Sequence, residues 1–140
     1  MTTEQHAGRC ISKLSNKLRR KIDGFSSKGE FSGSQGKALH FILTQTQDIF
    51  QKDIEEEYSL RPSTATELLK KMEQNGLIYR EPMANDARMK KIVVTNKALR
   101  YKDLVTKNIL GLEEELTRDI PKEDLAVFFR VMEKMLENIS

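Results

Sequence analysis

The stretch that decides the fold is PSTATELLKKMEQNGL, residues 62–77, followed directly by IYREPMANDARMKKIVVT, residues 78–95. In the first segment, positions 65, 68, 69 and 72 are apolar, which is the spacing of an amphipathic helix, and Asn75-Gly76 marks its C-terminal end. In the second, two short β-branched segments, 77–81 and 91–95, enclose a polar loop and predict a β-hairpin. A helix suited to a DNA groove, followed at once by a basic hairpin, predicts a winged helix-turn-helix.

The rest of the chain reads as helical. Ser32 with Gln35 three residues later forms the pattern of a capping box, in which two free amides at a helix start are satisfied reciprocally. Pro62 and Pro121 both suit the first position of a helix. The predicted helices cover residues 7–25, a segment beginning at 32, residues 49–57 and 63–74, a segment carrying Leu99 to Leu116, and one carrying Leu125 to Ile139. The predicted fold class is therefore mainly α with a small β-hairpin wing (α+β).

Helices at both ends of the chain carry long apolar stripes. The stripe of the first helix comprises Ile11, Leu14, Leu18, Ile22 and Phe25, and the two last helices have similar ones. Three such helices cannot all be buried against one small winged domain, so an intertwined homodimer is predicted. We therefore expect a single domain over residues 1–140, with a winged helix-turn-helix DNA-binding region at 32–97 and dimerisation helices at 7–28 and 98–140.

Composition and charge narrow the class of protein. The chain has 140 residues, enough for one domain with its own core, and no apolar run approaches the roughly 20 residues of a membrane span. The start, MTTEQHAGRC, lacks the apolar stretch of a secretory signal, and one cysteine fits a reducing compartment, so a cytoplasmic protein is expected. Residues 1–102 carry 19 Lys/Arg against 12 Asp/Glu, and residues 103–140 carry five against nine. The half with the predicted wing is thus positive, as a polyanion-binding surface requires.

The candidate DNA contacts lie on the outward face of residues 63–74 and on the wing. Small hydroxyl side chains let a helix approach base edges closely, lysines neutralise phosphates, and an arginine at a wing tip suits the narrow minor groove. Glu67 has two readings, because a carboxylate can accept from a cytosine amine or repel phosphate. The predicted DNA-binding residues are Ser63, Thr64, Thr66, Glu67, Lys70, Lys71, Arg88, Lys90 and Lys91.

Three segments, namely Asp86-Ala87-Arg88 with Thr95, Ser32 with Gln35, and the run from Glu73 to Arg80, resemble those of the MarR family of bacterial transcriptional regulators. Asp86-Ala87-Arg88 followed by Ile92, Val94 and Thr95 is similar to the family's D-x-R…LT wing pattern. Ser32 with Gln35 resembles its second-helix entry, and Glu73…Asn75-Gly76-Leu77-Ile78 followed by Arg80 resembles its helix-to-wing junction. The chain departs from the family pattern at Arg61, Glu67, Val94 and Ala98.

The resemblance implies a homodimer held by its terminal helices, with two winged domains that bind a pseudo-palindromic operator. It implies that Arg88 enters the minor groove and that Asp86 orients it. It also implies a small aromatic effector in the crevice between the dimer helices and the winged domain. The expected function is a sequence-specific regulator of transcription, a repressor on double-stranded DNA that is associated with the bacterial nucleoid when bound. The alternative is a winged-helix adaptor that binds proteins, which the acidic edge at residues 53–57 would serve.

Other chemistry is not indicated. One branch of the family senses oxidants through a cysteine near the start of the first helix, but Gly24 and Gln35 stand where its supporting tyrosines are expected, so Cys10 reads as an ordinary helical cysteine. His6 and His40 with one cysteine lack the spacing of a metal site. We find no catalytic triad, phosphate loop or acid pair, so neither an enzyme nor a cofactor is expected.

Overall fold

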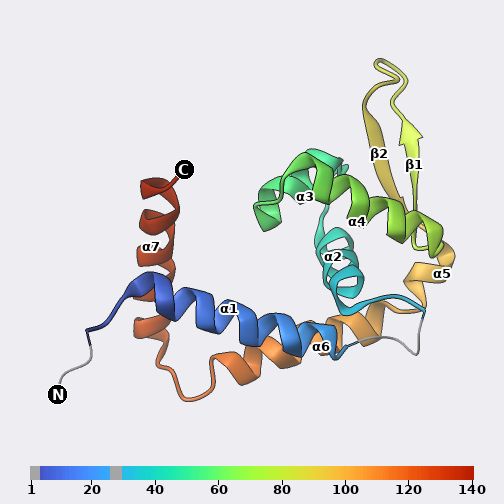
Figure 1. Cartoon of the computed structure of the whole chain (residues 1–140). Helices are drawn as coiled ribbons and strands as arrows, with labels where there is room; N and C mark the ends of the chain where they lie inside the picture. The colour runs from blue at the N-terminus through green and yellow to red at the C-terminus, as the bar shows by residue number, and fades with distance from the viewer. Residues whose placement is uncertain (1–3, 26–29) are drawn as a thin grey trace. The chain divides into compact units, whose positions relative to one another are not determined.

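The computed structural model describes residues 4–25 and 30–140 and contains helices and a single two-stranded hairpin within them. The elements are α1 (Ala7–Asp23), α2 (Gly33–Thr44), α3 (Gln51–Tyr58), α4 (Pro62–Gln74), β1 (Ile78–Pro82), β2 (Lys90–Val94), α5 (Asn96–Leu99), α6 (Lys102–Leu116) and α7 (Lys122–Asn138) (Figure 1). The predicted mainly α class with a β-hairpin wing is confirmed. Residues 26–28 of the first predicted dimerisation segment lie outside the described residues.

The core of the winged domain is where the amphipathic pattern placed it. Ala65, Leu69 and Met72 of α4 are completely buried, and Leu68 is half-buried beside them. Leu68, Leu69 and Met72 pack in one cluster with Leu39 from α2, with Ile54 from α3 and with buried residues around the hairpin. Because α2, α3, α4 and the hairpin share this cluster, they hold the exposed face of α4 and the wing in a fixed relation.

The end of α4 is built as the Asn75-Gly76 pair predicts. Gly76 has a φ of 72°, in the left-handed region that glycine adopts without steric cost. Its N–H donates to the Glu73 carbonyl at 3.0 Å, and the Leu77 N–H donates to the Met72 carbonyl at 2.9 Å, the two bonds of a Schellman motif. The chain therefore leaves the helix in a defined direction and enters β1 immediately.

The capping box predicted at the start of α2 is only half formed. The Ser32 hydroxyl accepts from the Gln35 N–H at 3.3 Å, as expected of an N-cap. The side-chain oxygen of Gln35, however, accepts from the side-chain amide of Asn75 at 2.8 Å. Gln35 is buried, and the bond to Asn75 satisfies its oxygen while it joins the start of α2 to the end of α4.

The antiparallel hairpin aligns Ile78 with Val94 and Pro82 with Lys90, one residue away from each predicted strand boundary. Ile49 forms an isolated bridge to Ile92 at its base, with the Ile92 N–H donating to the Ile49 carbonyl at 2.7 Å. The prediction that Ile49 begins the third helix is thus wrong. An apolar residue just before a helix has the same pattern as one in its first turn, so only the tertiary pairing distinguishes them.

Other helix boundaries also differ from prediction, and the first helix ends at Asp23 instead of Phe25. Leu99 belongs to the short helix α5, which the Thr95 side chain caps by accepting from the Ala98 N–H at 3.1 Å, and the chain turns at Arg100 and Tyr101 before α6 begins. Pro121 is the N-cap of α7 rather than its first residue. The shift at Pro121 is within the uncertainty of one or two residues that attends helix ends. The turn at residues 100–101 is larger than that, because it divides one predicted helix into α5 and α6.

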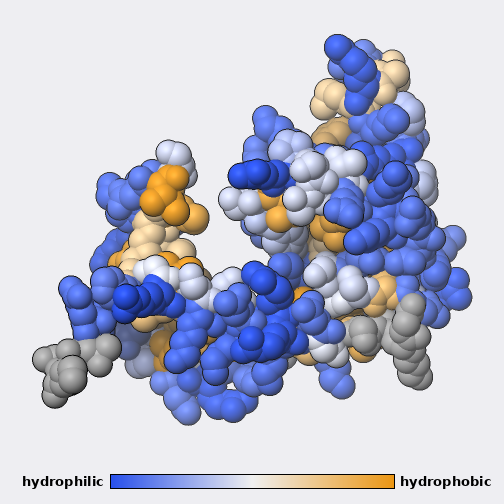
Figure 2. Space-filling model, viewed as in Figure 1, coloured by the Kyte–Doolittle hydropathy of each residue, from blue (hydrophilic) through white to orange (hydrophobic). Residues whose placement is uncertain are grey.

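The terminal helices leave much of their apolar stripes exposed within one chain. The chain divides into two compact units, the second running from Leu110 to Ser140. In the first unit, α1 has no buried residue, and Leu14 is 43% exposed. In the second, α7 likewise has none, Phe128 is 46% exposed, and Figure 2 shows apolar surface along this helix. None of the described helices is both long and apolar enough to span a bilayer.

Candidate nucleic-acid interface

Helix α4 presents a polar face opposite its buried one. The side chains on this face belong to residues predicted to contact DNA, and all of them are exposed: Ser63, Thr64, Thr66, Glu67, Lys70 and Lys71. Pro62 stands at the first helical position, as predicted, so α4 begins with small hydroxyl side chains in its first turn. Short side chains at the N-terminal end allow the backbone itself to come near a binding partner.

One of the hydroxyls is already engaged within the protein. Thr66 Oγ1 donates to the Pro62 carbonyl at 2.8 Å and accepts from the side-chain amide of Gln51 at 2.9 Å. Gln51 also donates to the Pro62 carbonyl at 3.2 Å, so it fastens the start of α3 to the first turn of α4. Thr66 thus offers its methyl group and a remaining lone pair, whereas Ser63 and Thr64 are the hydroxyls better suited to donate to a ligand.

The charges of α4 are partly compensated. Lys71 Nζ lies 3.9 Å from Glu67 Oε1, one helical turn away, and both side chains are well exposed. Such a solvent-exposed pair contributes little to stability, about 0–1 kcal/mol, and either partner can leave it at small cost. Lys70 is exposed on the same helix. Glu67 therefore lies beside a cation that can offset its repulsion of phosphate.

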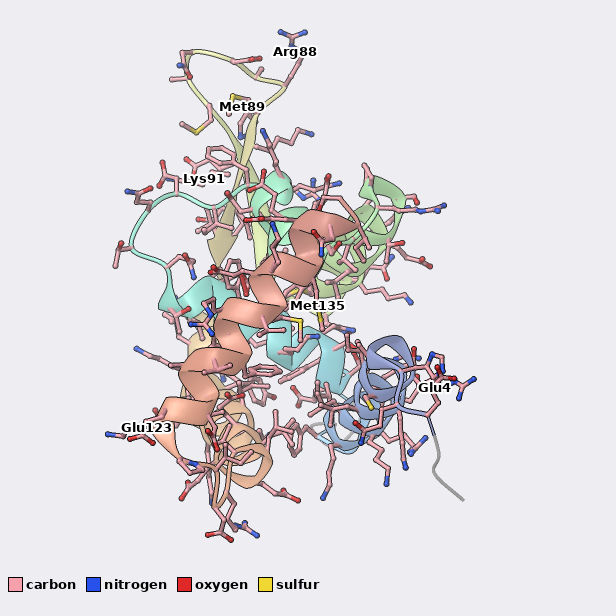
Figure 3. All side chains as sticks on the ribbon, turned by 90° about the vertical axis from the view of Figure 1, so that its left-hand side faces the viewer. Glu4, Arg88, Met89, Lys91, Glu123 and Met135 are labelled. Atoms are coloured by element: carbon pink, nitrogen blue, oxygen red, sulfur yellow. The ribbon has the colours of Figure 1, made fainter. Side chains whose placement is uncertain are left out.

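Arg88 stands at the tip of the wing. Its side chain is 93% exposed, and Figure 3 shows it directed away from the body of the hairpin. Asp86 Oδ1 accepts from the backbone N–H of Arg88 at 3.0 Å and from its side-chain Nε at 3.3 Å. These two bonds restrain the stem of the arginine and leave the far end of the guanidinium facing outward. Asp86 is thus positioned to orient Arg88.

The two wing lysines differ from each other. Lys90 is exposed at the start of β2. Lys91 is half-buried, and its Nζ lies 3.9 Å from Asp48 Oδ1. In Figure 3 Lys91 lies further from the tip than Arg88. Arg88 and Lys90 are therefore the exposed cations of the wing, while Lys91 has an internal partner.

Two residues hold this surface in shape: Gln51, which sequence reasoning missed, and Arg80, which it named at the helix-to-wing junction without a structural role. Gln51, described above, ties α3 to α4. Arg80 on β1 forms an ion pair with Glu73 on α4, with Nε 3.2 Å from Oε1, and the Arg80 side chain is only 20% exposed. This pair links α4 to the wing. The alternation of β1 gave a signal for Arg80, because the residue shares a strand face with buried Ile78 and therefore points toward the domain.

A separate recess lies where α2 faces the first part of α6. Its lining is mostly apolar and comprises Phe25, Phe31, Gly33, Gly36, Lys37, Leu104, Val105, Asn108 and Ile109. Lys37 Nζ lies 4.5 Å from the centre of the Tyr58 ring, and the Tyr58 hydroxyl donates to the Lys37 carbonyl at 3.2 Å. Burial lowers the pKa of Lys37 and, together with nearby Glu57, raises the pKa of Tyr58.

Among the described residues, no group of His, Cys, Asp or Glu side chains is arranged to hold a metal ion. Cys10 is exposed on α1. His40 lies half-buried on α2.

Comparisons with known proteins identify the family of the chain. The sequence model of the MarR family matches residues 33–90. The HTH-type transcriptional regulator YwoH of Bacillus subtilis (strain 168) is 30% identical over 104 residues, which cover 74% of each chain. The chain therefore belongs to the MarR family of transcriptional regulators.

Solved structures share the fold along nearly the whole chain. The transcription regulator MarR from Oenococcus oeni PSU-1 superposes with a TM-score of 0.83 at 27% identity, covering 94% of this chain and 99% of that one. MepR of S. aureus in a complex with DNA superposes with a TM-score of 0.84 at 24% identity, covering 96% and 99%. The likeness to MepR concerns the fold.

Proposed function

We propose that this protein is a sequence-specific regulator that binds double-stranded DNA as a homodimer and represses transcription from a pseudo-palindromic operator. The observation that carries the proposal is the joint exposure of two groups on one rigid winged domain: the hydroxyl-and-lysine face of α4 and the guanidinium of Arg88. The first suits base edges and phosphates in a major groove, and the second suits the negative potential of a narrow minor groove. MepR, which has the same fold, has been solved with DNA.

Within this proposal, residues 32–97 form the DNA-binding region. Ser63, Thr64 and Lys70 contact the major-groove side, and Lys71 contacts phosphate from its place beside Glu67, whose charge it offsets. On the wing, Arg88 enters the minor groove under the control of Asp86, and Lys90 approaches the adjacent backbone. Lys91 contributes less, since its ammonium group is near Asp48. Thr66 acts mainly through its methyl group, because its hydroxyl is engaged by Pro62 and Gln51.

The homodimer is supported by the terminal helices. Neither α1 nor α7 buries a single residue within one chain, although both carry large apolar side chains. Burial of such surface against a second copy stabilises by about 25 cal/mol per Å². Residues 7–28 and 98–140 are thus proposed as the dimerisation helices. Two recognition helices about 34 Å apart would then meet successive major grooves on one side of the duplex.

A small aromatic effector is proposed to act at the recess between α2 and α6, which must widen to admit it, because its free volume of about 10 Å³ is that of a single water. Its lining offers Phe25 and Phe31 for ring contacts and Lys37 for a polar or anionic substituent. A ligand changes DNA affinity only by as much as it prefers one arrangement of the protein over another. An occupant of this recess would act by shifting the position of the winged domain. We expect the protein itself to act in the cytoplasm, on the bacterial nucleoid.

The experiment that tests the proposal is selection of bound duplexes from a random pool, followed by footprinting of the enriched sequence. A pseudo-palindrome with half-sites about one helical turn apart is the expected result, and its affinity should fall steeply as salt rises. An adaptor that works through protein contact, the alternative, would enrich no sequence. That outcome would remove the DNA-binding role and direct attention to the acidic edge of α3.

A further inference from the structure

The C-terminal end of α4, the proposed recognition helix, is contacted by Lys97 of α5, the short helix that follows the wing. Lys97 Nζ donates to the Asn75 carbonyl at 2.8 Å, and the stem of Lys97 lies across Gly76, where an added Cβ would meet Lys97 Cδ at 3.5 Å. The carbonyl end of a helix carries partial negative charge, so an ammonium group is well placed there. Lys97 is half-buried, unlike the lysines of the α4 face.

The same ammonium group is held from its other side. Glu30 Oε2 lies 4.0 Å from Lys97 Nζ, and the Tyr101 hydroxyl donates a hydrogen bond to the same carboxylate oxygen. Tyr101 in turn packs edge-on against Phe31, with ring centres 4.9 Å apart, and Phe31 lines the recess between α2 and α6. A continuous series of contacts therefore runs from that recess to the last turn of the recognition helix.

We propose that Lys97 is a positioning residue for DNA recognition: with Glu30 it fixes the end of α4, and it never touches the duplex. The inference rests on the proposed DNA-binding function. It goes further by assigning a role in DNA sequence specificity to a residue outside the exposed face of α4. Neighbouring hydrogen bonds support such a role. Thr95 Oγ1 donates to the Gly76 carbonyl at 2.6 Å, and the Asn75 side chain donates to Gln35, so the turn from α4 into β1 is restrained. Among the described residues that donate to the carbonyls of this turn, Lys97 is the only charged one.

A positioning lysine and a phosphate-binding lysine leave different signatures. Loss of a phosphate contact weakens binding to every duplex and reduces the salt dependence by about one unit per contact. Loss of a positioning contact lowers affinity for the selected operator, leaves affinity for a random duplex unchanged, and preserves the salt dependence. The coupling to Glu30 adds a third signature, since two residues that act as a unit give non-additive effects.

The test compares Lys97→Met with Lys97→Arg, Glu30→Gln and the double variant in the full-length protein. The probes are the operator duplex from the selection and a scrambled duplex of equal length. Lys97→Met should lower operator affinity by about threefold to tenfold and leave the scrambled duplex within about 1.5-fold. Lys97→Arg should bind the operator about as well as wild type does. Glu30→Gln should cause little further loss of operator affinity in the protein that already carries Lys97→Met. Lys102→Met, an exposed lysine at the start of α6, is the matched control and should behave as wild type.

A measurement on the free protein separates failure of this inference from failure of the DNA-binding proposal. In Lys97→Met, the amides of Asn75, Gly76 and Leu77 should exchange with solvent about threefold to tenfold faster, while that of Met83 in the wing keeps its rate. Unchanged exchange at residues 75–77 would overturn the positioning role whether or not the protein binds DNA. Equal loss on both duplexes with a reduced salt slope would instead identify Lys97 as a direct phosphate contact.

Discussion

Replacement of Arg88 by alanine separates DNA binding from stability. The side chain is 93% exposed, and its nearest charged partner is Asp86 at 3.3 Å, so the substitution removes no packing. An exposed pair of this kind contributes about 0–1 kcal/mol, and the free energy of unfolding should therefore change by less than about 1 kcal/mol. Operator affinity should fall at least tenfold, which corresponds to about 1.4 kcal/mol. Shared between the two wings of a dimer, that is about 0.7 kcal/mol for each arginine.

The assay is fluorescence anisotropy with the selected operator at several salt concentrations, together with thermal unfolding and a sedimentation measurement of the dimer. Lys52→Ala is the matched control, because Lys52 is an exposed cation on α3 that pairs with Glu56 at 4.0 Å. It should bind the operator as the wild type does. If Arg88→Ala retained full operator affinity and an unaltered salt dependence, the role of the wing tip in DNA recognition would be refuted.

The remaining predictions address orientation, the helix end, the core and the dimer. Asp86→Asn should weaken operator binding by less than Arg88→Ala, because it loosens the guanidinium without removing it; equal loss in the two variants would mean that Asp86 has a different role. Gly76→Ala should lower the free energy of unfolding by about 1–2 kcal/mol, since its φ of 72° is unfavourable for a residue with a Cβ, and a denaturant titration that gave no change would contradict that assignment. Leu69→Ala should cost about 2–5 kcal/mol in the same titration, because Leu69 is completely buried; a loss below 1 kcal/mol would argue against the described core. Phe128→Glu should shift sedimentation from dimer to monomer while the winged domain stays folded by circular dichroism, and a persistent dimer would exclude α7 from the interface.

Much of the winged domain was predictable because its signals are local. The spacing of Ala65, Leu69 and Met72 gave the buried face of α4, and that face left the hydroxyls and lysines exposed. Asn75-Gly76 gave the helix end, since a left-handed turn requires a residue such as glycine. The wing followed from two β-branched segments around a polar loop. Each of these inferences depends on residues within a few positions of one another.

Other features depended on residues far apart in the chain. Gln35 reads as the partner of Ser32, yet its side-chain oxygen is bonded to Asn75, forty residues away. Ile49 reads as helical, yet it pairs with Ile92. Lys91 reads as a free wing cation, yet Asp48 lies beside it. In each case the residue has a partner that is distant in the chain, and the neighbouring sequence does not indicate that this partner replaces the local one.

The amino-acid sequence by itself determined the family, the amphipathic recognition helix and the arginine at the wing tip, because periodicity and turn chemistry act over short distances. Only the tertiary structure decided which hydroxyls remain free, which wing lysine is exposed and how Lys97 meets the end of α4. Hydrogen bonds and ion pairs form between whichever groups folding brings within about 3–4 Å, and that proximity depends on how the whole core is packed.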